Sequence, residues 1–344
     1  MTSELTMRRL LRWTAAALTA SAACLLAGNA SAQIREHSFK LATTDPDASA
    51  GPVGLKKLVE LVDKKSGGKI KLKLYTSSVL GNDAQMLASI QGGTIDFGLH
   101  GSPTLTGTAK EYSVLDFPFM IRSAREADQL LDGPMGARLL GRLEEKGVIG
   151  LGFWENGFRQ LTNSKRPITK WEDMAGIKMR VVASPVFLDY FNSLGANAVP
   201  MPIAEVYSAL ETKAIDGEDN PIHNISSIKF FEVQKYLSLG SHVYTSYTLT
   251  ASKKTWDRLN AEEKALIKEA ADEAKLYERQ VARDLNGRLL ADLKKSMQVN
   301  EISPDELARF AEKAKPIYDK HAKNIGEDFV RDWLAALEAI RAKK

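Results

Sequence analysis

The stretch Ile70–Leu99 has the sequence IKLKLYTSSVLGNDAQMLASIQGGTIDFGL and contains a strand, a helix and a second strand in succession. Apolar residues alternate with lysines over Ile70–Tyr75, which is the period of two of a half-buried strand. A helix is expected over about Asp83–Gln91, and a glycine pair ends it before a strand at Ile95–Leu99. This alternation predicts a parallel sheet covered by helices, and therefore an α/β fold.

The same alternation continues on both sides of this stretch. A strand at Phe39–Ala42 and an amphipathic helix at Val53–Lys65 precede it. Further along, the pattern predicts strands at Val148–Phe153 and Gly176–Val182 and a helix at Val186–Leu194. A chain of 344 residues is long enough for one large domain or two of ordinary size.

Two segments of the chain resemble each other. EVYSALETKAID (Glu205–Asp216) lies 120 positions after QMLASIQGGTID (Gln85–Asp96), and each is predicted to be a helix, a short turn and the start of a buried strand. Chance similarity between two αβ turns is the alternative explanation. A true repeat predicts two lobes of one architecture, with a cleft between them at the carboxyl ends of the strands.

The C-terminal third of the chain is predicted to be helical. Asn260 and Glu263 form a plausible capping box. Apolar residues recur at helical spacing over Leu266–Leu293, and no glycine or proline interrupts them before Gly287. We therefore expect one very long helix that spans both lobes, followed by two shorter helices, the last at Ile325–Ala342.

The first residues have the organisation of a secretory signal peptide. A basic segment, Met7–Arg12, precedes an apolar stretch over Ala15–Ala27. The segment Asn29–Ala32 then supplies the A-x-A pattern of a signal peptidase site. We expect cleavage between Ala32 and Gln33 and export to the periplasm, since the apolar run is short for a transmembrane anchor.

Charge and cysteine content exclude several classes of protein. The net charge of +4 falls to about +2 without residues 1–32, which is too small to indicate nucleic-acid binding. Cys24 is the single cysteine, so the exported chain has no disulfide, and a lipoprotein is the alternative interpretation of that residue. No later segment is long and apolar enough to cross a membrane.

The sequence contains no motif that indicates catalysis. Its five histidines lack metal-binding spacing, and neither a G-x-S-x-G elbow nor a Walker loop is present. The acidic cluster at Asp216–Asp219 fits no standard cation-binding loop. We therefore expect no enzyme activity, no metal and no cofactor.

One predicted strand carries an arginine next to a turn. Over Gly176–Val182, Met179 points to one side and Arg180 to the other, and the turn Ala183–Pro185 follows. An arginine at such a strand end can line a cleft, or it can lie along the surface with its guanidinium in water.

Four segments resemble a known family: WENGFRQLTNSKRPI, WEDMAGIKMRV, SLGANAVPMPIAEVYSALETKAIDGEDNP and KFFEVQKYL. They are similar to the solute-binding proteins of tripartite ATP-independent periplasmic (TRAP) transporters of the dicarboxylate-binding DctP type. LGNDAQML, GGTIDFGLHG and LDFPFM follow the family more loosely. The resemblance implies a two-lobed periplasmic binding protein fold whose lobes close on a ligand in the cleft between them.

The resemblance also implies roles for three residues. Arg180 would clamp a substrate carboxylate, since a guanidinium presents two parallel N–H donors to two carboxylate oxygens. Arg159 matches a second arginine of the family pocket, and Asn220 matches an asparagine that binds the ligand and helps to hold Arg180. Relatives commonly have Gln-Glu-Asn where this chain has Glu218-Asp219-Asn220, which leaves any role of position 218 open.

Further ligand-binding candidates follow from strand ends. Thr44 follows the first strand, and His100 and Ser102 follow the third, so we expect all three to face the cleft from lobe I. His100 would meet a second carboxylate or a hydroxyl, with a packing role as the alternative. Phe187 is a candidate apolar wall of the pocket, with a place in the core as its alternative.

The resemblance also implies how the chain divides. Residues 1–32 are the signal peptide. Residues 33–155 form lobe I, completed by roughly residues 246–285. Residues 156–245 form lobe II, completed by the C-terminal helices to residue 344.

Two arginines suit a C4-dicarboxylate such as malate, succinate or fumarate, which we favour as the ligand. A sugar acid or another monocarboxylate is the alternative. The implied partners are the integral membrane subunits of a transporter, and we expect a monomer that does not itself span the membrane. A periplasmic ligand sensor and an organic-acid enzyme are the alternatives of another class.

Overall fold

The computed structural model describes residues 33–343. The expected signal peptide, its cleavage after Ala32 and the cysteine Cys24 lie outside the described residues. Within the described part, no helix combines the length and the apolar character that a membrane span requires.

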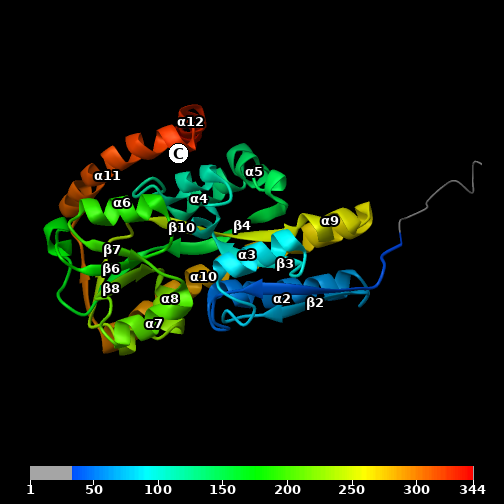
Figure 1. Cartoon of the computed structure of the whole chain (residues 1–344), viewed down its shortest axis with the longest axis horizontal. Coiled ribbons are helices and arrows are strands. Elements are labelled where there is room, and N and C mark those ends of the chain that lie inside the picture. The colour runs from blue at the N-terminus through cyan, green and yellow to red at the C-terminus, as the bar shows by residue number, and fades with distance from the viewer. Residues whose placement is uncertain (1–32, 344) are drawn as a thin grey trace, which may run out of the picture.

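A five-stranded sheet, sheet A, forms the first half of the fold (Figure 1). Its strands, in spatial order, are β2 (Ile70–Tyr75), β1 (His37–Thr43), β3 (Phe97–Gly101), β10 (Tyr244–Ser252) and β4 (Val148–Phe158). Strands β1, β2 and β3 are parallel, as the alternation of elements predicted. Strand β10 is antiparallel to both of its neighbours, because it returns directly from the other half of the molecule without a crossover helix.

A six-stranded sheet, sheet B, forms the second half. Its strands, in spatial order, are β11 (Gln298–Glu301), β9 (Tyr236–Leu239), β5 (Gln160–Asn163), β8 (Gly217–Asn220), β6 (Lys178–Val181) and β7 (Asn197–Pro200). Strand β6 is parallel to β7 and β8, whereas β5 is antiparallel to β8 and β9. Below, lobe I is sheet A with the helices that cover it, and lobe II is sheet B with its helices.

Helices cover both sheets. The α-helices are α2 (Ala50–Lys65), α3 (Asp83–Gly92), α4 (Ala124–Leu131), α5 (Pro134–Gly141), α6 (Pro185–Ser193), α7 (Ile203–Glu211), α8 (Ile222–Ser227), α9 (Lys253–Arg258), α10 (Ala261–Ser296), α11 (Pro304–Ile325) and α12 (Glu327–Ala342). Short 3-10 helices are η1 (Ser102–Leu105), η2 (Lys110–Asp116), η3 (Glu144–Lys146), η4 (Trp171–Met174) and η5 (Phe230–Glu232).

Each sheet buries apolar residues on both faces. On one face of sheet A, Leu41 and Leu99 pack with residues of α2 and α10. On the other face, Phe153 packs with residues of α3, α4 and α5. In sheet B, Met179 and Val181 face the core shared with α6 and α11, so the alternation along β6 turns Arg180 to the opposite side.

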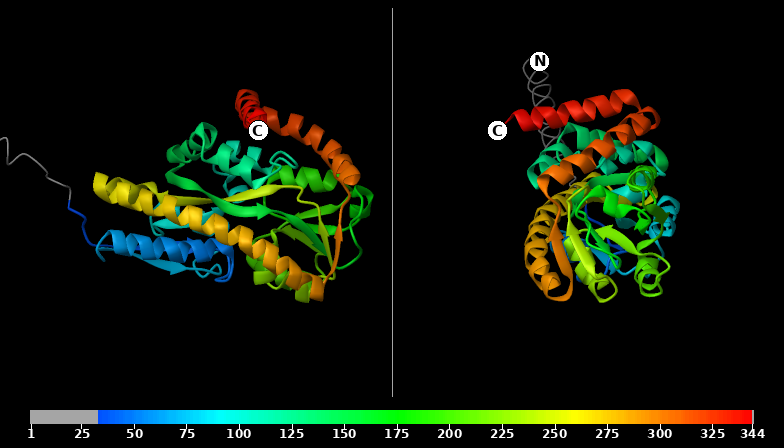
Figure 2. Two further views of the ribbon diagram at one scale, coloured as in Figure 1. Left: turned by 180° about the vertical axis from the view of Figure 1, so that it is seen from behind. Right: turned by 90° about the vertical axis from the view of Figure 1, so that its left-hand side faces the viewer.

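The long helix α10 joins the two lobes. It begins with the expected capping box between Asn260 and Glu263 and continues through Gly287 for 36 residues, which corresponds to about 54 Å. One end packs on α2 and β4, and the other packs on α8 and β11. Figure 2 shows it running along the molecule past both sheets.

Two other segments of chain pass between the sheets. The first follows Phe158, the last residue of β4, and the second lies between Leu239 and Tyr244. They run side by side, since the Arg159 amide donates to the Val243 carbonyl at 2.8 Å. Arg159 therefore lies at the junction of the lobes.

The C-terminal helices differ from our expectation that they complete lobe II. Helix α11 packs on α6, but α12 packs on α4 of lobe I. Its apolar residues Phe329, Trp333 and Leu337 join the core of lobe I. The Arg341 guanidinium also forms an ion pair with Glu126 at 3.0 Å, so both packing and charge hold α12 against lobe I.

Candidate ligand-binding cleft

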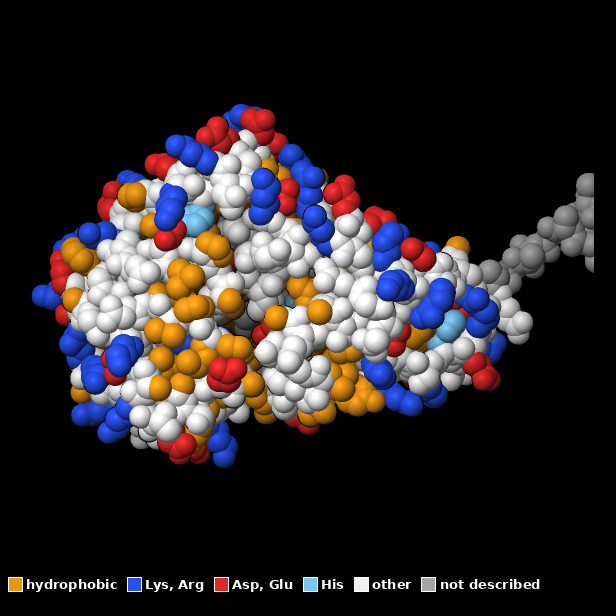
Figure 3. All heavy atoms as spheres, viewed as in Figure 1, with side chains coloured by type: hydrophobic (Ala, Val, Ile, Leu, Met, Phe, Trp, Pro, Cys, Tyr) orange, Lys and Arg blue, Asp and Glu red, His pale blue; other side chains and the backbone are white. Residues whose placement is uncertain are grey.

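A cavity lies between the two lobes at the carboxyl ends of β1 and β6, the position expected for a ligand site in open α/β sheets. The residues that line it are Thr44, Asp45, Asp83, Gly101, Pro103, Thr104, Asn156, Arg159, Arg180, Val182, Ile203, Asn220, Asn224 and Tyr247. An adjoining hollow shares Asp83 and Arg180 and continues to Met201. Figure 3 shows the surface hollowed between the two halves of the molecule.

Arg180 is a buried cation with unused hydrogen-bonding capacity. Its side chain comes from β6, and the residue is 2% exposed. Nε and Nη2 donate to the Met201 carbonyl at 2.9 and 2.7 Å, whereas Nη1 has no partner among the described residues. Burial, together with the nearby Arg159, lowers the pKa of Arg180 to about 10, so the side chain remains charged at neutral pH. Such a group is complementary to an anion in the cleft.

Arg159 is already paired. Its Nε lies 2.5 Å from Asp219 Oδ2, and its Nη2 donates to Oδ1 at 3.0 Å. His242 Nε2 lies 3.1 Å from the same carboxylate. Burial opposes ionisation of Asp219, but the charge of Arg159 and these hydrogen bonds hold the pKa of Asp219 well below its ordinary value. The positive charge of Arg159 is therefore balanced within the protein.

Asn220 lies beside Arg180 on the neighbouring strand β8. Its amide donates to Glu218, which also accepts a hydrogen bond of 2.8 Å from Thr162. Burial raises the pKa of Glu218 to about 7. The hydrogen bonds of Arg180 go to Met201, so they do not link it to Asn220 as the resemblance implied.

Two carboxylates from lobe I enter the cleft, and sequence reasoning missed both. Asp45 directly follows Thr44, and Asp83 is the first residue of α3. Thr44 Oγ1 donates to Asp83 Oδ1 at 3.2 Å. Burial raises the pKa of Asp45 to about 7 and also raises the pKa of Asp83, although the hydrogen bond from Thr44 and the charge of Arg180 oppose the second shift. The signal in the sequence is the position of Asp45, which follows a predicted strand and adjoins the candidate residue Thr44.

Three expected ligand residues do not line the cavity. We expected His100 and Ser102 to face the cleft, but both are fully buried behind it. Strand β3 continues to Gly101. Its alternation therefore turns His100 to the face of sheet A opposite the one on which Leu99 lies, and His100 is paired in register with Thr248 of β10. Burial lowers the pKa of His100 to about 4. Phe187 is also fully buried, with its ring 5.5 Å from the Arg159 guanidinium, and so supports that side chain from behind.

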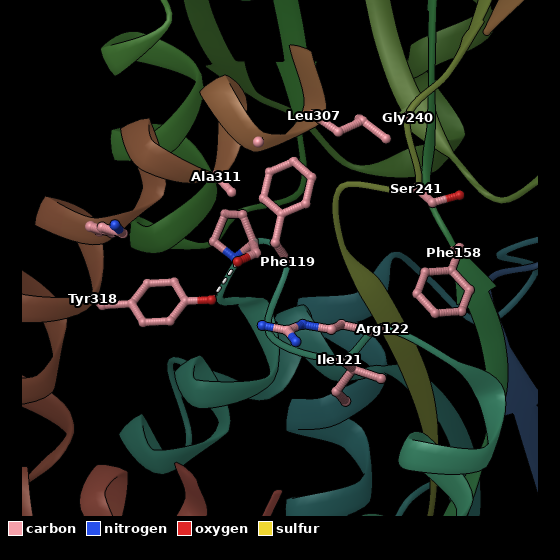
Figure 4. Close-up of a pocket in the computed structure, with 12 residues that line it drawn as sticks. Phe119, Ile121, Arg122, Phe158, Gly240, Ser241, Leu307, Ala311 and Tyr318 are labelled. Carbon is pink, nitrogen blue, oxygen red and sulfur yellow. Dashed lines mark hydrogen bonds between the residues drawn. The ribbon is translucent and has the colours of Figure 1, made fainter. Parts of the chain in front are cut away.

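A second hollow lies where α11 meets the segments that connect the lobes (Figure 4). Its wall is mainly apolar and includes Phe119, Phe158 and Leu307. Its cations, Arg122 and Lys315, are exposed to solvent. The polar side chains that converge on Arg180 have no counterpart there, so the cleft between the sheets is the better candidate for an anion site.

Comparison with known proteins agrees with this architecture. Residues 41–324 match the family described as bacterial extracellular solute-binding protein, family 7 (DctP). The 2,3-diketo-L-gulonate-binding periplasmic protein YiaO of Escherichia coli strain K12 is 36% identical over 271 residues, covering 79% of this chain and 83% of that protein. The C4-dicarboxylate-binding periplasmic protein DctP of Rhodobacter capsulatus is 32% identical over 302 residues, covering 87% of this chain and 89% of that protein.

A solved structure has the same fold. The sugar acid binding protein DctPAm from Advenella mimigardefordensis strain DPN7T, in complex with galactonate, is similar with a TM-score of 0.88 and 38% identity. The match covers 89% of this chain and 99% of that one. Both the resemblance and the two-lobed α/β fold expected from the sequence are thus confirmed. The chain belongs to the DctP family of TRAP-transporter solute-binding proteins.

Proposed function

We propose that the protein captures a small organic acid in the periplasm and delivers it to the integral membrane subunits of a TRAP transporter. The observation that carries this proposal is the unpartnered Nη1 of Arg180, a buried cationic donor that faces the cleft between the lobes. A ligand carboxylate would supply the missing acceptor, and a charge-assisted hydrogen bond is stronger than a neutral one.

Ligand capture would be coupled to closure of the lobes. Arg180 and Asn220 come from lobe II, whereas Thr44, Asp45 and Asp83 come from lobe I, so a ligand between them contacts both. A ligand that contacts both lobes stabilises the closed arrangement over an open one. The segments that pass between the sheets are the natural hinge.

The relatives are named for acids of different classes. One relative is named for C4-dicarboxylates, another for 2,3-diketo-L-gulonate, and a similar structure contains galactonate. Our preference for a C4-dicarboxylate depended on two arginines free to bind carboxylates. Because Arg159 is paired with Asp219, that reason for the preference no longer holds.

Replacement of Arg180 by alanine tests the proposal. Isothermal titration calorimetry against a panel of C4-dicarboxylates, 2-oxo acids and sugar acids should identify a ligand of the wild type. We expect Arg180→Ala to weaken its binding by about 2–5 kcal/mol, roughly thirtyfold or more, because a ligand charge would be left unpaired in the cleft. Arg166→Ala, which removes an exposed arginine of lobe II, is the control. Equal affinity of Arg180→Ala and wild type would refute the assignment.

Two further observations distinguish the transport role from its alternatives. Loss of uptake of the bound acid after deletion of the gene would support transport over sensing. Recovery of the acid chemically unchanged after prolonged incubation with the protein would argue against an enzyme.

A further inference from the structure

On the basis of the carboxylate binding proposed above, we propose that the ligand is a monocarboxylic acid with several hydroxyl groups, and that Asp45 and Asp83 select it over dicarboxylates. The carboxylate of such an acid would bind at Arg180. Its hydroxyl groups would donate hydrogen bonds to the two aspartates on the opposite wall.

The cavity offers a ligand little positive charge. Arg180 and Arg159 are the cationic residues that line the cavity in the described part of the chain. Arg159 donates to both carboxylate oxygens of Asp219 and lies in contact distance of Phe187 on its other side. Nη1 of Arg159 takes no part in these hydrogen bonds and can still donate to a ligand oxygen, but Asp219 neutralises the charge of this guanidinium, and drawing it away would leave a buried carboxylate without its partner. The charge of Arg180 is therefore the one positive charge of the cavity lining without a bonded carboxylate, enough for one ligand carboxylate.

The wall that lobe I contributes to the cavity carries two carboxyl groups. The cavity is lined there by Asp45, which is 6% exposed, and by Asp83, which is held by Thr44. Where the two aspartates are ionised, a second ligand carboxylate on this side would meet like charges in a partly desolvated site, which disfavours binding. Because burial raises the pKa of Asp45 to about 7, its part of this repulsion is fully present only above neutral pH. A hydroxyl group meets no such repulsion and can donate to a carboxylate.

One hydrogen-bond acceptor of the cavity lining, Asn224 Oδ1, has no donor among the described residues. The residue is 3% exposed. Its amide nitrogen contacts Asn156 Oδ1 at 3.2 Å and the Tyr247 hydroxyl at 3.4 Å. An ionised carboxylate has no donor to satisfy an acceptor, whereas a hydroxyl group can donate to one amide and accept from another. Sites built with unpaired polar groups discriminate strongly against ligands that cannot pair them.

Matched pairs of acids test this inference by calorimetry on the wild-type protein at about pH 8.5, above the raised pKa of Asp45. Erythronate and meso-tartrate share one carbon chain, as do galactonate and galactarate, and within each pair a terminal hydroxymethyl group is replaced by a carboxylate. We expect the monocarboxylate of at least one pair to bind about tenfold or more tightly than its diacid. Succinate, which has two carboxylates and no hydroxyl groups, should bind weakly.

Variants then assign the selection to residues. Asp83→Asn and Asp45→Asn keep the shape of each side chain but remove its charge, so they should narrow the preference for the monocarboxylate severalfold by improving binding of the diacid. Asp47→Asn, which removes an exposed carboxylate two residues from Asp45, should leave the preference unchanged. Thermal unfolding of each variant verifies that it is folded.

The outcomes separate this inference from the proposed function. A wild-type protein that binds diacids as tightly as their monocarboxylate partners, with binding lost in Arg180→Ala, would overturn the inference and leave the proposed function intact. Failure to bind any acid would overturn both. A preference that persists unchanged in folded Asp45→Asn and Asp83→Asn proteins would overturn the assignment to these residues.

Discussion

At the scale of single residues, burial and partners decide what each charged group can do. Arg159 and Arg180 are both almost fully buried beside the same cleft. Arg159 forms an ion pair with Asp219, whereas Arg180 bonds a backbone carbonyl and keeps one nitrogen without a partner. The two arginines therefore differ in charge balance, because Asp219 neutralises Arg159 whereas the hydrogen bonds of Arg180 go to a backbone carbonyl.

Glu218 should make the stability of the protein depend on pH. Burial raises the pKa of Glu218 from 4.5 to about 7. Between these two values, the folded chain holds a proton that the unfolded chain has released. The free energy of unfolding therefore falls as the pH rises through this window.

Glu218→Gln should remove this titration while keeping the size of the side chain. We expect the fall in the free energy of unfolding between about pH 5 and pH 8 to be smaller in the variant by about 1–3 kcal/mol. Urea unfolding at several pH values measures it, with exposed Glu145→Gln as the control. If the free energy of unfolding of Glu218→Gln and that of the wild type fell equally with pH, the expectation would be contradicted.

At the scale of elements, α10 shows how packing sets the cost of a change. Gly287 lies within this helix, and a Cβ added there meets no atom within 4 Å. In α2, which packs against α10, a Cβ added at Gly54 would lie 2.5 Å from side-chain atoms of Glu278 and 2.8 Å from Trp154. Replacement of glycine by alanine should therefore change the free energy of unfolding in opposite directions at the two positions.

Gly287→Ala should stabilise the protein by about 0.5–1 kcal/mol, because alanine restricts the unfolded chain and fits the helix. Gly54→Ala should destabilise it by about 1–3 kcal/mol through overpacking between α2 and α10. Equilibrium unfolding of the two variants measures both changes. Destabilisation by Gly287→Ala would indicate that the helix is not continuous at this point.

At the scale of the whole molecule, buried polar contacts join the two lobes in addition to α10 and the connecting segments. Ser184, at the start of α6, donates to Asp116 Oδ2 of lobe I at 2.6 Å, and both residues are fully buried. Ser49, at the start of α2, lies 2.7 Å from Ser227 of α8. These contacts favour the arrangement of lobes in which the cleft residues face each other.

Ser184→Ala should therefore weaken ligand binding without touching the ligand site. Loss of one hydrogen bond between the lobes costs about 0.5–1.5 kcal/mol, which corresponds to a two- to tenfold weaker affinity when binding requires closure. Titration with the tightest ligand of the wild type measures the change. Ser193→Ala, at the other end of α6, removes a hydrogen bond to Tyr190 within lobe II and should not change the affinity. Equal effects of Ser184→Ala and Ser193→Ala on the affinity would argue against a role of the Ser184 hydrogen bond in closure of the lobes.

The local elements and the family can both be predicted from the order of residues along the chain. Alternation of apolar residues located β2 and β6, and the pair Asn260 and Glu263 marked the start of α10, because periodicity and capping depend on neighbours in the chain. The same alternation turned Arg180 away from the core occupied by Met179. The segments around Arg159, Arg180 and Asn220 carried the resemblance that the comparisons confirmed.

The charge balance of the cleft depends on contacts that form only in the folded chain. No local pattern pairs Arg159 with Asp219, places Asp45 and Asp83 opposite Arg180, or buries His100 against sheet A. The tertiary structure also places β10 in sheet A and α12 against α4. These contacts join parts of the chain that are far apart in sequence. The free energy of a charge depends on its burial and on its neighbours in space, which the order of residues along one element does not specify.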